Sequence, residues 1–269
     1  MIAIPISLVV IFLVFLFLIA PKNRREMNEF KSVYYAHRGL HNAERAENSM
    51  SAFRAAVEAG FGIELDVRLS KDGRLVVFHD DTLDRVCGRE GRVDDFTAEE
   101  LATFRLSGTE DGIPLLTDVL AVVDGKIPLL VEIKENVGNS AVSKEACRIL
   151  ADYKGRYIVE SFNPLSLRTV KEKNPEIVRG ILAYRYFAEE KNRKPLYFLL
   201  QCLMLNFLCR PAFIAYKHKD GRYLALRFVR FFFKTPTVAW TVCSPEEEAI
   251  ARKNGFDGII FEGYIPKNK

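Results

Sequence analysis

Short runs of apolar residues recur along the chain from residue 33 onward, and segments with apolar positions at helical spacing lie between many of them. Several of these runs are almost wholly apolar, which is typical of parallel strands that are buried on both faces of a sheet. The pattern predicts eight strands, at residues 33–36, 62–66, 75–78, 129–133, 157–160, 178–182, 237–240 and 258–261.

The segment 49–59 has apolar residues at helical spacing, is preceded by Asn48 and Ser49 as candidate N-caps, and is followed by Gly60. Eight strands with helices between them predict an α/β fold, a closed (β/α)8 TIM barrel. A doubly wound sheet is the alternative, although no glycine-rich dinucleotide loop follows the first strand. Further helices are expected near residues 97–105, 140–152, 164–173 and 245–253.

Two connections are too long to be simple loops. Residues 80–127 join the third and fourth predicted strands, and residues 183–235 join the sixth and seventh. Connections of this length are usually functional. We therefore expect one barrel domain at 33–269, with an insertion at 80–127 and a long apolar and basic connection at 183–235.

Residues 2–20 form an uncharged apolar run that roughly matches a bilayer core of ~30 Å. No basic residue precedes the run, so an uncleaved anchor is favoured over a signal peptide. Lys22, Arg24 and Arg25 follow it, and the positive-inside rule then places the remainder in the cytoplasm. The expectation is a single-pass protein of the cell membrane, with a transmembrane anchor at 2–20 and a juxtamembrane linker at 21–32.

A second membrane contact is expected within residues 196–234. Residues 196–208 are apolar but short for a span, and a buried helix explains them about as well. Residues 217–234 contain six Lys or Arg and one Asp. As a helix, this segment would be basic and amphipathic and could lie on an anionic bilayer.

Composition narrows the functional classes. The net charge of +4 over 269 residues is mild, and no long basic stretch interleaved with aromatic residues indicates nucleic-acid binding. Five cysteines without C-x-x-C spacing define neither a zinc site nor a disulfide framework, and reduced thiols suit a cytosolic environment. The oligomeric state cannot be read from the sequence.

The candidate chemistry lies where the first four predicted strands end. Alternate strand residues share one face, and in a barrel they converge at the C-terminal mouth, where such folds place their sites. Charge at the ends of apolar strands is costly unless it is paired or bound to metal. The polar residues at these ends are His37 and Arg38, Glu64 and Asp66, His79 and Asp80, and Glu132 and Lys134.

Together these side chains describe phosphodiester cleavage. Three carboxylates suit Mg²⁺ or Ca²⁺, and two histidines can act as base and acid. Arg38 and Lys134 supply positive charge for a phosphate. Each residue taken singly also has a structural explanation, as a hydrogen-bonded histidine, a solvated rim carboxylate or an ion-pair partner.

The stretch AHRGLHNAERAENSMSAFRAAVEAGFGIELDVRLSKDGRLVVFHDDTLDR resembles the glycerophosphodiester phosphodiesterase family, and VEIK, VESFNP and VAWTV match later family motifs in order. The resemblance covers nearly everything from residue 33 onward. It implies a barrel with one divalent cation that hydrolyses glycerophosphodiesters to glycerol 3-phosphate and an alcohol. It also implies roles for the strand-end residues: Glu64, Asp66 and Glu132 as metal ligands, His37 and His79 as the acid–base pair, and Arg38 and Lys134 as phosphate contacts.

Other matches to the family are weaker. Ala46 replaces the proline before the Glu47-Asn48 pair, which we interpret as a loop brace and helix cap. Trp240 ends a strand and would wall the glycerol side of the pocket, although packing explains it nearly as well. Glu262 stands in GIIFEGYIP where the family more often has Thr-Asp, which leaves the eighth-strand contact open. Residues 80–127 resemble the family's small insertion.

Two alternatives to the proposed hydrolysis stay open at this stage. Lysophospholipase D-like cleavage of membrane lysophospholipids is the alternative among enzymes, favoured by the apolar 183–235 connection. A membrane-tethered binding or regulatory module with a silent site is the non-enzymatic alternative. The sequence does not distinguish attack by water from attack by a glycerol hydroxyl that would give a cyclic phosphate.

Overall fold

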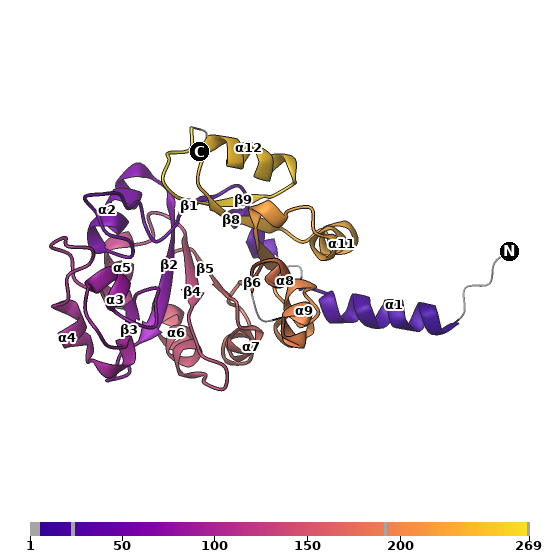
Figure 1. The fold of residues 1–269 in the computed structure, drawn as a ribbon, viewed down its shortest axis with the longest axis horizontal. Coiled ribbons are helices and arrows are strands. Elements are labelled where there is room, and N and C mark those ends of the chain that lie inside the picture. The colour runs from indigo at the N-terminus through magenta and orange to yellow at the C-terminus, as the bar shows by residue number, and fades with distance from the viewer. Residues whose placement is uncertain (1–5, 23–24, 191–192, 268–269) are drawn as a thin grey trace.

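The computed structural model describes residues 6–22, 25–190 and 193–267. Eight parallel strands close into a barrel, because β1 pairs with both β2 and β9, and helices surround it (Figure 1). The (β/α)8 prediction is confirmed, and the doubly wound alternative is wrong because the sheet has no open parallel edge in the described chain. The barrel strands are β1 (Tyr34–Ala36), β2 (Gly62–Leu69), β4 (Leu129–Ile133), β5 (Tyr157–Ser161), β6 (Arg179–Ala183), β7 (Phe213–Lys217), β8 (Thr237–Val242) and β9 (Gly258–Phe261).

One predicted barrel strand was wrong, and one was missed. Residues 75–77 form β3 (Leu75–Val77), which runs antiparallel to the end of β2 in a hairpin and is not a barrel strand. The eighth barrel strand is β7, inside the 183–235 connection. β7 follows a mostly apolar stretch at 196–209, where the pattern alone does not separate a buried helix from a buried strand.

The helix at 49–59 is confirmed as α2 (Met50–Ala59). The Ser49 side chain accepts a hydrogen bond from the Ala52 backbone N–H, and Gly60 ends the helix with φ 71°. The other helical elements are α3 (Asp84–Cys87), η2 (Val93–Asp95), α4 (Ala98–Ala102), α5 (Leu116–Val123), α6 (Ala141–Asp152), α7 (Pro164–Lys173), α8 (Tyr186–Glu189), α9 (Pro195–Gln201), α10 (Asn206–Cys209), η3 (His218–Asp220), α11 (Leu224–Phe233) and α12 (Pro245–Lys253).

The barrel interior has an apolar layer below a carboxylate layer. Leu130 of β4 and Ile158 of β5 belong to a buried apolar cluster, and Glu132 and Glu160 follow them two residues later on the same faces. Met27 and Phe30, in the stretch expected to be a linker, join this cluster from η1 (Arg25–Phe30). Apolar side chains therefore fill the lower part of the barrel, and the charged groups lie toward its mouth.

The predicted transmembrane anchor is wrong. The apolar run forms α1 (Ile6–Ile19), 14 residues long, which rises about 21 Å against a bilayer core of ~30 Å. Residues 2–5 of the predicted span, and Arg24 of its basic flank, lie outside the described residues. Within the described chain no helix is long and apolar enough to span a membrane. This finding contradicts the predicted single-pass membrane placement, and the cytoplasmic orientation was deduced only from that placement.

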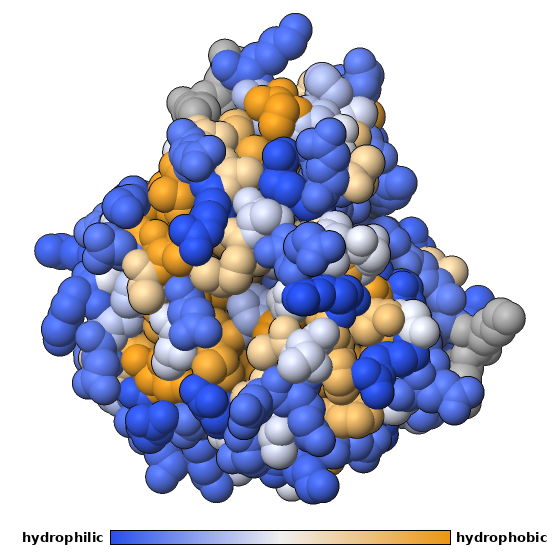
Figure 2. Space-filling model, turned by 90° about the vertical axis from the view of Figure 1, so that its left-hand side faces the viewer, coloured by the Kyte–Doolittle hydropathy of each residue, from blue (hydrophilic) through white to orange (hydrophobic). Residues whose placement is uncertain are grey.

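Helix α1 is nevertheless attached to the barrel domain at its C-terminal end. Asn206 donates a side-chain hydrogen bond to the Ile19 carbonyl at 3.0 Å, and Arg210 donates to the Phe17 and Ala20 carbonyls at 2.9 Å each. From there α1 projects away from the body (Figure 1). The opposite face of the molecule is covered mainly by hydrophilic residues with smaller hydrophobic patches (Figure 2).

Candidate active site

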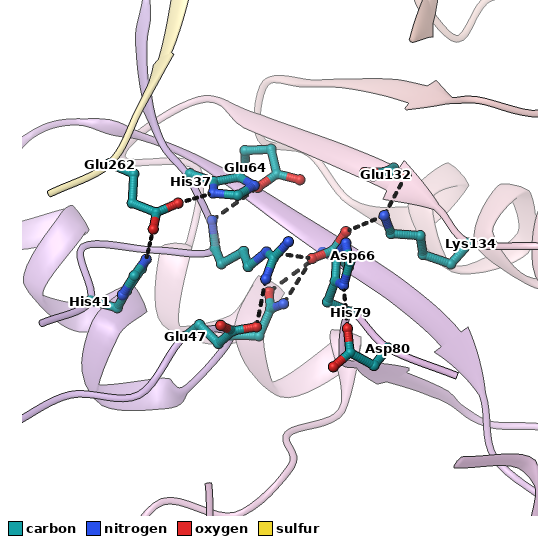
Figure 3. Close-up of polar contacts among 12 residues, drawn as sticks. His37, His41, Glu47, Glu64, Asp66, His79, Asp80, Glu132, Lys134 and Glu262 are labelled. Carbon is teal, nitrogen blue, oxygen red and sulfur yellow. Dashed lines mark hydrogen bonds and ion pairs between the residues drawn. The ribbon is translucent and has the colours of Figure 1, made fainter. Parts of the chain in front are cut away.

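Three buried carboxylates meet at the mouth of the barrel. Glu64 and Asp66 lie two residues apart on β2, and the parallel register sets Asp66 beside Glu132 of β4. Their side chains are within reach of one another because each offers an oxygen that lies within 4.8 Å of the others. The three residues are only 2%, 0% and 6% exposed. The predicted metal ligands are thus brought together (Figure 3).

Burial and mutual repulsion oppose full ionisation of this cluster. Burial raises the pKa of Glu64 well above its ordinary value, and the neighbouring Asp66 and Glu132 raise it further. Burial also raises the pKa of Glu132, to about 7, although Lys134 opposes the shift. Burial acts in the same direction on Asp66, but Lys134, His79 and Arg38 outweigh it and lower the pKa of this carboxyl.

These residues fit a hard divalent cation. The three groups are the oxygen donors that Mg²⁺ and Ca²⁺ prefer, and the charge repulsion among them is what a cation would relieve. The Oδ1 atom of Asp66 is buried without a hydrogen-bond partner in the described chain, with Lys134 Nζ 3.2 Å away. The Oδ2 atom accepts a hydrogen bond from Asn48 at 2.9 Å, which orients the carboxylate.

His37 follows β1 and is oriented by a residue from the opposite end of the chain. Its Nδ1 atom lies 2.5 Å from Glu262 Oε2, just after β9, and its Nε2 atom lies 3.9 Å from Glu64. The hydrogen bond to His37 lowers the pKa of Glu262 to about 2. His41 lies on the other side of Glu262, at 3.9 Å. The eighth-strand contact that the sequence left open is therefore a carboxylate that holds His37.

His79 follows the β2–β3 hairpin. Its Nδ1 atom lies 2.6 Å from Asp80 Oδ1. Burial lowers the pKa of His79, and the cations Lys134 and Arg38 act in the same direction against Asp66 and Asp80. Both predicted acid–base histidines thus have a carboxylate on Nδ1, which leaves Nε2 for a reaction partner.

Arg38 and Lys134 lie against the carboxylate cluster. The Arg38 backbone N–H donates to Glu64 at 2.9 Å, and its guanidinium donates to Glu47 at 2.7 Å. Lys134 Nζ lies 2.8 Å from Glu132, and the nearby carboxylates raise the pKa of this ammonium despite its burial. Two positive charges therefore flank the predicted metal position, where a phosphate would bind.

The site opens into a cavity of about 110 Å³ that is lined by both histidines and, on another wall, by Phe162, Leu182 and Trp240. The Trp240 ring lies 5.4 Å from the Phe162 ring, edge to face. The indole Nε1 of Trp240 is buried without a hydrogen-bond partner among the described residues. Trp240 therefore lines the pocket and also packs on Phe162, and its contact with the glycerol side of a substrate stays a prediction.

Sequence reasoning missed one residue of the site, Glu160, and gave another, Asn48, the wrong role. Glu160, in the VESFNP motif, lines the same cavity, and burial raises its pKa well above the ordinary value. Asn48 is not the helix cap, which is Ser49, but holds Asp66. Glu47 is the expected brace, because it binds Arg38 and also Arg85. For Glu160, the signal was a charged residue two positions after an apolar strand residue.

Fold and site together define a class: a (β/α)8 barrel with an acidic mouth that could hold a metal ion and that suits phosphodiester chemistry. The sequence model of the Glycerophosphoryl diester phosphodiesterase family matches residues 37–263, and the chain belongs to that family.

Relatives agree along nearly the whole chain. A glycerophosphodiester phosphodiesterase of Caldanaerobacter subterraneus subsp. tengcongensis is 38% identical over 241 residues, which cover 86% of this chain and 93% of the relative. The crystal structure of a glycerophosphodiester phosphodiesterase from Thermotoga maritima aligns with a TM-score of 0.67 at 30% identity, over 86% of this chain and 94% of that chain. A phosphodiesterase from Oleispira antarctica, solved with its product sn-glycerol-3-phosphate, shares the fold with a TM-score of 0.71 at 22% identity, over 87% and 94% of the two chains. These relatives do not favour the lysophospholipase D-like or the non-enzymatic alternative.

Proposed function

We propose that this protein hydrolyses glycerophosphodiesters to sn-glycerol 3-phosphate and an alcohol. Family membership and the 38% identical phosphodiesterase support the reaction. The observation that carries the proposal is the position of two carboxylate-held histidines beside three buried carboxylates and two cations.

Each side chain has a step in this proposal. Arg38 and Lys134 hold the phosphoryl oxygens and offset their charge. One histidine accepts the proton of the attacking oxygen at Nε2, and the other donates a proton to the leaving alcohol. Glu262 and Asp80 hold the two rings so that Nε2 faces the phosphate. The attacking oxygen belongs to water or to the neighbouring glycerol hydroxyl.

Glu64, Asp66 and Glu132 would hold one divalent cation, Mg²⁺ or Ca²⁺. When bound, the cation polarises a phosphoryl oxygen and stabilises negative charge in the transition state. Around it, the chain supplies a site from which apolar side chains below and aromatic rings at the wall exclude water.

The full chain tests the reaction directly. Release of glycerol 3-phosphate from glycerophosphocholine is measured with EDTA, Mg²⁺ or Ca²⁺, beside His37→Ala, His79→Ala and the exposed control Glu99→Gln. We expect release that requires a cation, is lost in both histidine variants and is kept in the control. No release by folded wild-type protein with either cation would refute the proposal. Phosphorus NMR during turnover separates water attack from a cyclic phosphate.

We further propose that α1, α9 and α11 make a reversible contact with an anionic bilayer surface. Leu224 and Phe231 of α11 are 64% and 69% exposed, and apolar side chains of α1 and α9 are also exposed. Phe12 and Phe15 of α1 pack edge to face on Phe232 and Phe228 of α11, which makes one apolar surface of the two helices.

Basic residues border this surface. Arg227 of α11, Lys234 directly after α11 and Lys194 before α9 are exposed, a charge pattern that suits anionic lipid. Arg230, one of the six basic residues counted in 217–234, is instead structural: it donates to Thr237 and to the Gly221 and Asn254 carbonyls. Burial lowers its pKa to about 10.

Flotation with vesicles tests the contact. We expect the full chain to bind vesicles that contain phosphatidylglycerol more than pure phosphatidylcholine vesicles, and Phe231→Glu to weaken that binding. Ile250→Glu, at an exposed apolar residue of α12, is the matched control. Equal vesicle binding by Phe231→Glu and wild type would refute the contact. If the wild type instead forms a dimer that Phe231→Glu weakens, the surface binds a second copy of the chain, and the bilayer contact is refuted.

A further inference from the structure

Arg85 of α3 lies outside the set of residues that would touch the substrate, yet it binds two carboxylates at the edge of the site. Its Nε atom donates to Asp80 Oδ2 at 2.6 Å. Its Nη1 and Nη2 atoms donate to the two oxygens of Glu47 at 2.8 and 2.7 Å. Figure 3 shows Glu47 and Asp80 along the same, lower edge of the group.

Each of these carboxylates in turn binds one side chain of the proposed machinery. Glu47 Oε1 accepts a hydrogen bond from Arg38 Nη1 at 2.7 Å. Asp80 Oδ1 lies 2.6 Å from His79 Nδ1. One guanidinium is therefore linked to the phosphate-binding Arg38 and to the acid–base His79, through one carboxylate each.

The charges along this chain of contacts alternate. Burial would raise the pKa of Glu47, but hydrogen bonds and charge from Arg85 and Arg38 lower it. Burial acts likewise on Asp80, and its hydrogen bonds to Arg85 and His79 lower its pKa to about 2. Both carboxylates are ionised at neutral pH, so each remains an acceptor for the group it orients.

We propose that Arg85 is a positioning residue that holds Arg38 and His79 in register with each other for the reaction proposed above. Only a planar guanidinium offers a fork for Glu47 and a third N–H for Asp80 at the same time. Without it, Glu47 is free to turn both oxygens toward Arg38 and draw that side chain from the phosphate. Asp80 likewise loses the bond that keeps its other oxygen on His79.

The exposure of Arg85 separates this role from a stabilising one. Its side chain is 50% exposed. Ion pairs at such positions contribute little to folding stability, because water screens them and ordering long side chains costs entropy. A loss of Arg85 should therefore lower turnover much more than it lowers the thermal midpoint of unfolding.

The test compares Arg85→Met and Arg85→Lys with Arg105→Met in the full chain. Arg105 is an exposed arginine of the same connection whose guanidinium donates to the Glu110 carbonyl, which makes it a matched control. We expect kcat/KM for glycerophosphocholine to fall about ten- to a hundredfold in Arg85→Met, the range typical for residues that orient catalytic groups. Arg85→Lys should recover only part of the loss, and Arg105→Met should match wild type.

Two further measurements distinguish positioning from a general structural effect. Added guanidinium ion should restore part of the turnover of Arg85→Met, and potassium at equal ionic strength should not. In a Glu47→Gln, Asp80→Asn background, Arg85→Met should lower kcat/KM by a much smaller factor than in the wild-type background, because the two carboxylates that Arg85 binds are already replaced.

The outcomes are separable from the proposed function. Failure of the wild type to release glycerol 3-phosphate refutes the reaction itself. If the wild type is active and kcat/KM of Arg85→Met lies within threefold of the wild-type value, the positioning role is overturned. It is also overturned if Arg85→Met lowers kcat/KM by the same factor in the Glu47→Gln, Asp80→Asn background as in the wild-type background. If Arg85→Met does not fold, Arg85→Lys provides the test. Wild-type turnover of Arg85→Lys would show that a guanidinium with paired N–H groups is not required at this position, and would overturn the positioning role.

Discussion

At the scale of single residues, each histidine of the proposed acid–base pair is held by a carboxylate at its Nδ1 atom. Glu262 holds His37 although 225 positions separate them in the chain. Asp80 holds His79 from the adjacent position. A carboxylate at Nδ1 has the same effect on both histidines: it fixes the orientation of the ring and leaves Nε2 for a reaction partner.

Glu262→Ala should lower kcat for glycerophosphocholine about ten- to a hundredfold with a smaller change in KM, because His37 loses its orientation while the phosphate contacts remain. Steady-state kinetics of the variant, beside the exposed control Glu246→Gln, measure the effect. Unchanged kcat would show that the short contact does not serve the reaction.

Metal-free protein should lose stability as the pH rises from about 4.5 through about 7. Glu132 has a folded-state pKa of about 7, above its ordinary 4.5, so in this window the folded state binds more protons than the unfolded state. Stability therefore falls with rising pH, and a bound cation should remove the fall. Thermal unfolding at pH 5 to 8, with EDTA or with Mg²⁺ or Ca²⁺, checks this. A midpoint in EDTA that is flat across the window, in both wild type and Glu132→Gln, would contradict it.

At the scale of elements, the β2–β3 hairpin and helix α2 place the loops that carry the site. The hairpin returns the chain antiparallel to β2 and delivers His79 to the mouth of the barrel. Helix α2 starts at Met50, and its N-cap Ser49 directly follows Glu47 and Asn48, so the helix N-terminus determines where those two residues lie.

Ser49→Ala should therefore destabilise the protein by about 0.5–2 kcal/mol, the usual cost of a lost N-cap. Ser49 accepts a hydrogen bond from Ala52 N–H, whereas Ser140, at the N-cap position of α6, makes no such bond. Denaturant unfolding of Ser49→Ala and Ser140→Ala compares the two. Equal stability of both variants would show that the cap does not hold this loop.

At the scale of the whole molecule, α1 and the active site are separate features. Among the described residues, helix α1 packs on α10 and α11, whereas the proposed acid–base and carboxylate residues lie at the mouth of the barrel. Its apolar surface and the barrel mouth can therefore be altered independently.

A chain that lacks residues 1–17 should keep kcat/KM for glycerophosphocholine within about twofold of wild type, because catalysis resides in the barrel domain. The same truncation should weaken binding to phosphatidylglycerol vesicles. Kinetics and flotation on one preparation measure both. A large loss of kcat/KM by truncated protein that is still folded would instead connect α1 to the active site.

The sequence by itself determined the barrel class, most strands and the identities of the central charged groups. It could do so because side chains alternate along a strand, so charged residues two positions apart at an apolar strand end must share a face. For that reason the sequence predicted that Glu64 and Asp66 lie on one face of their strand, and that Glu132 and Lys134 do so on theirs. The capped helix α2 was equally local, since its N-cap and C-terminal glycine lie within the segment itself.

Only the tertiary structure decided the features that depend on distant pairings. Whether residues 75–77 enter the barrel or fold back on β2, and whether 213–217 is strand or helix, depends on which neighbour supplies backbone hydrogen bonds. The contacts of Glu262 with His37 and of Arg85 with Glu47 join residues far apart in the chain. The C-terminal end of α1 at Ile19 was also decided there, because hydropathy reports how apolar a run is and not where its helix ends.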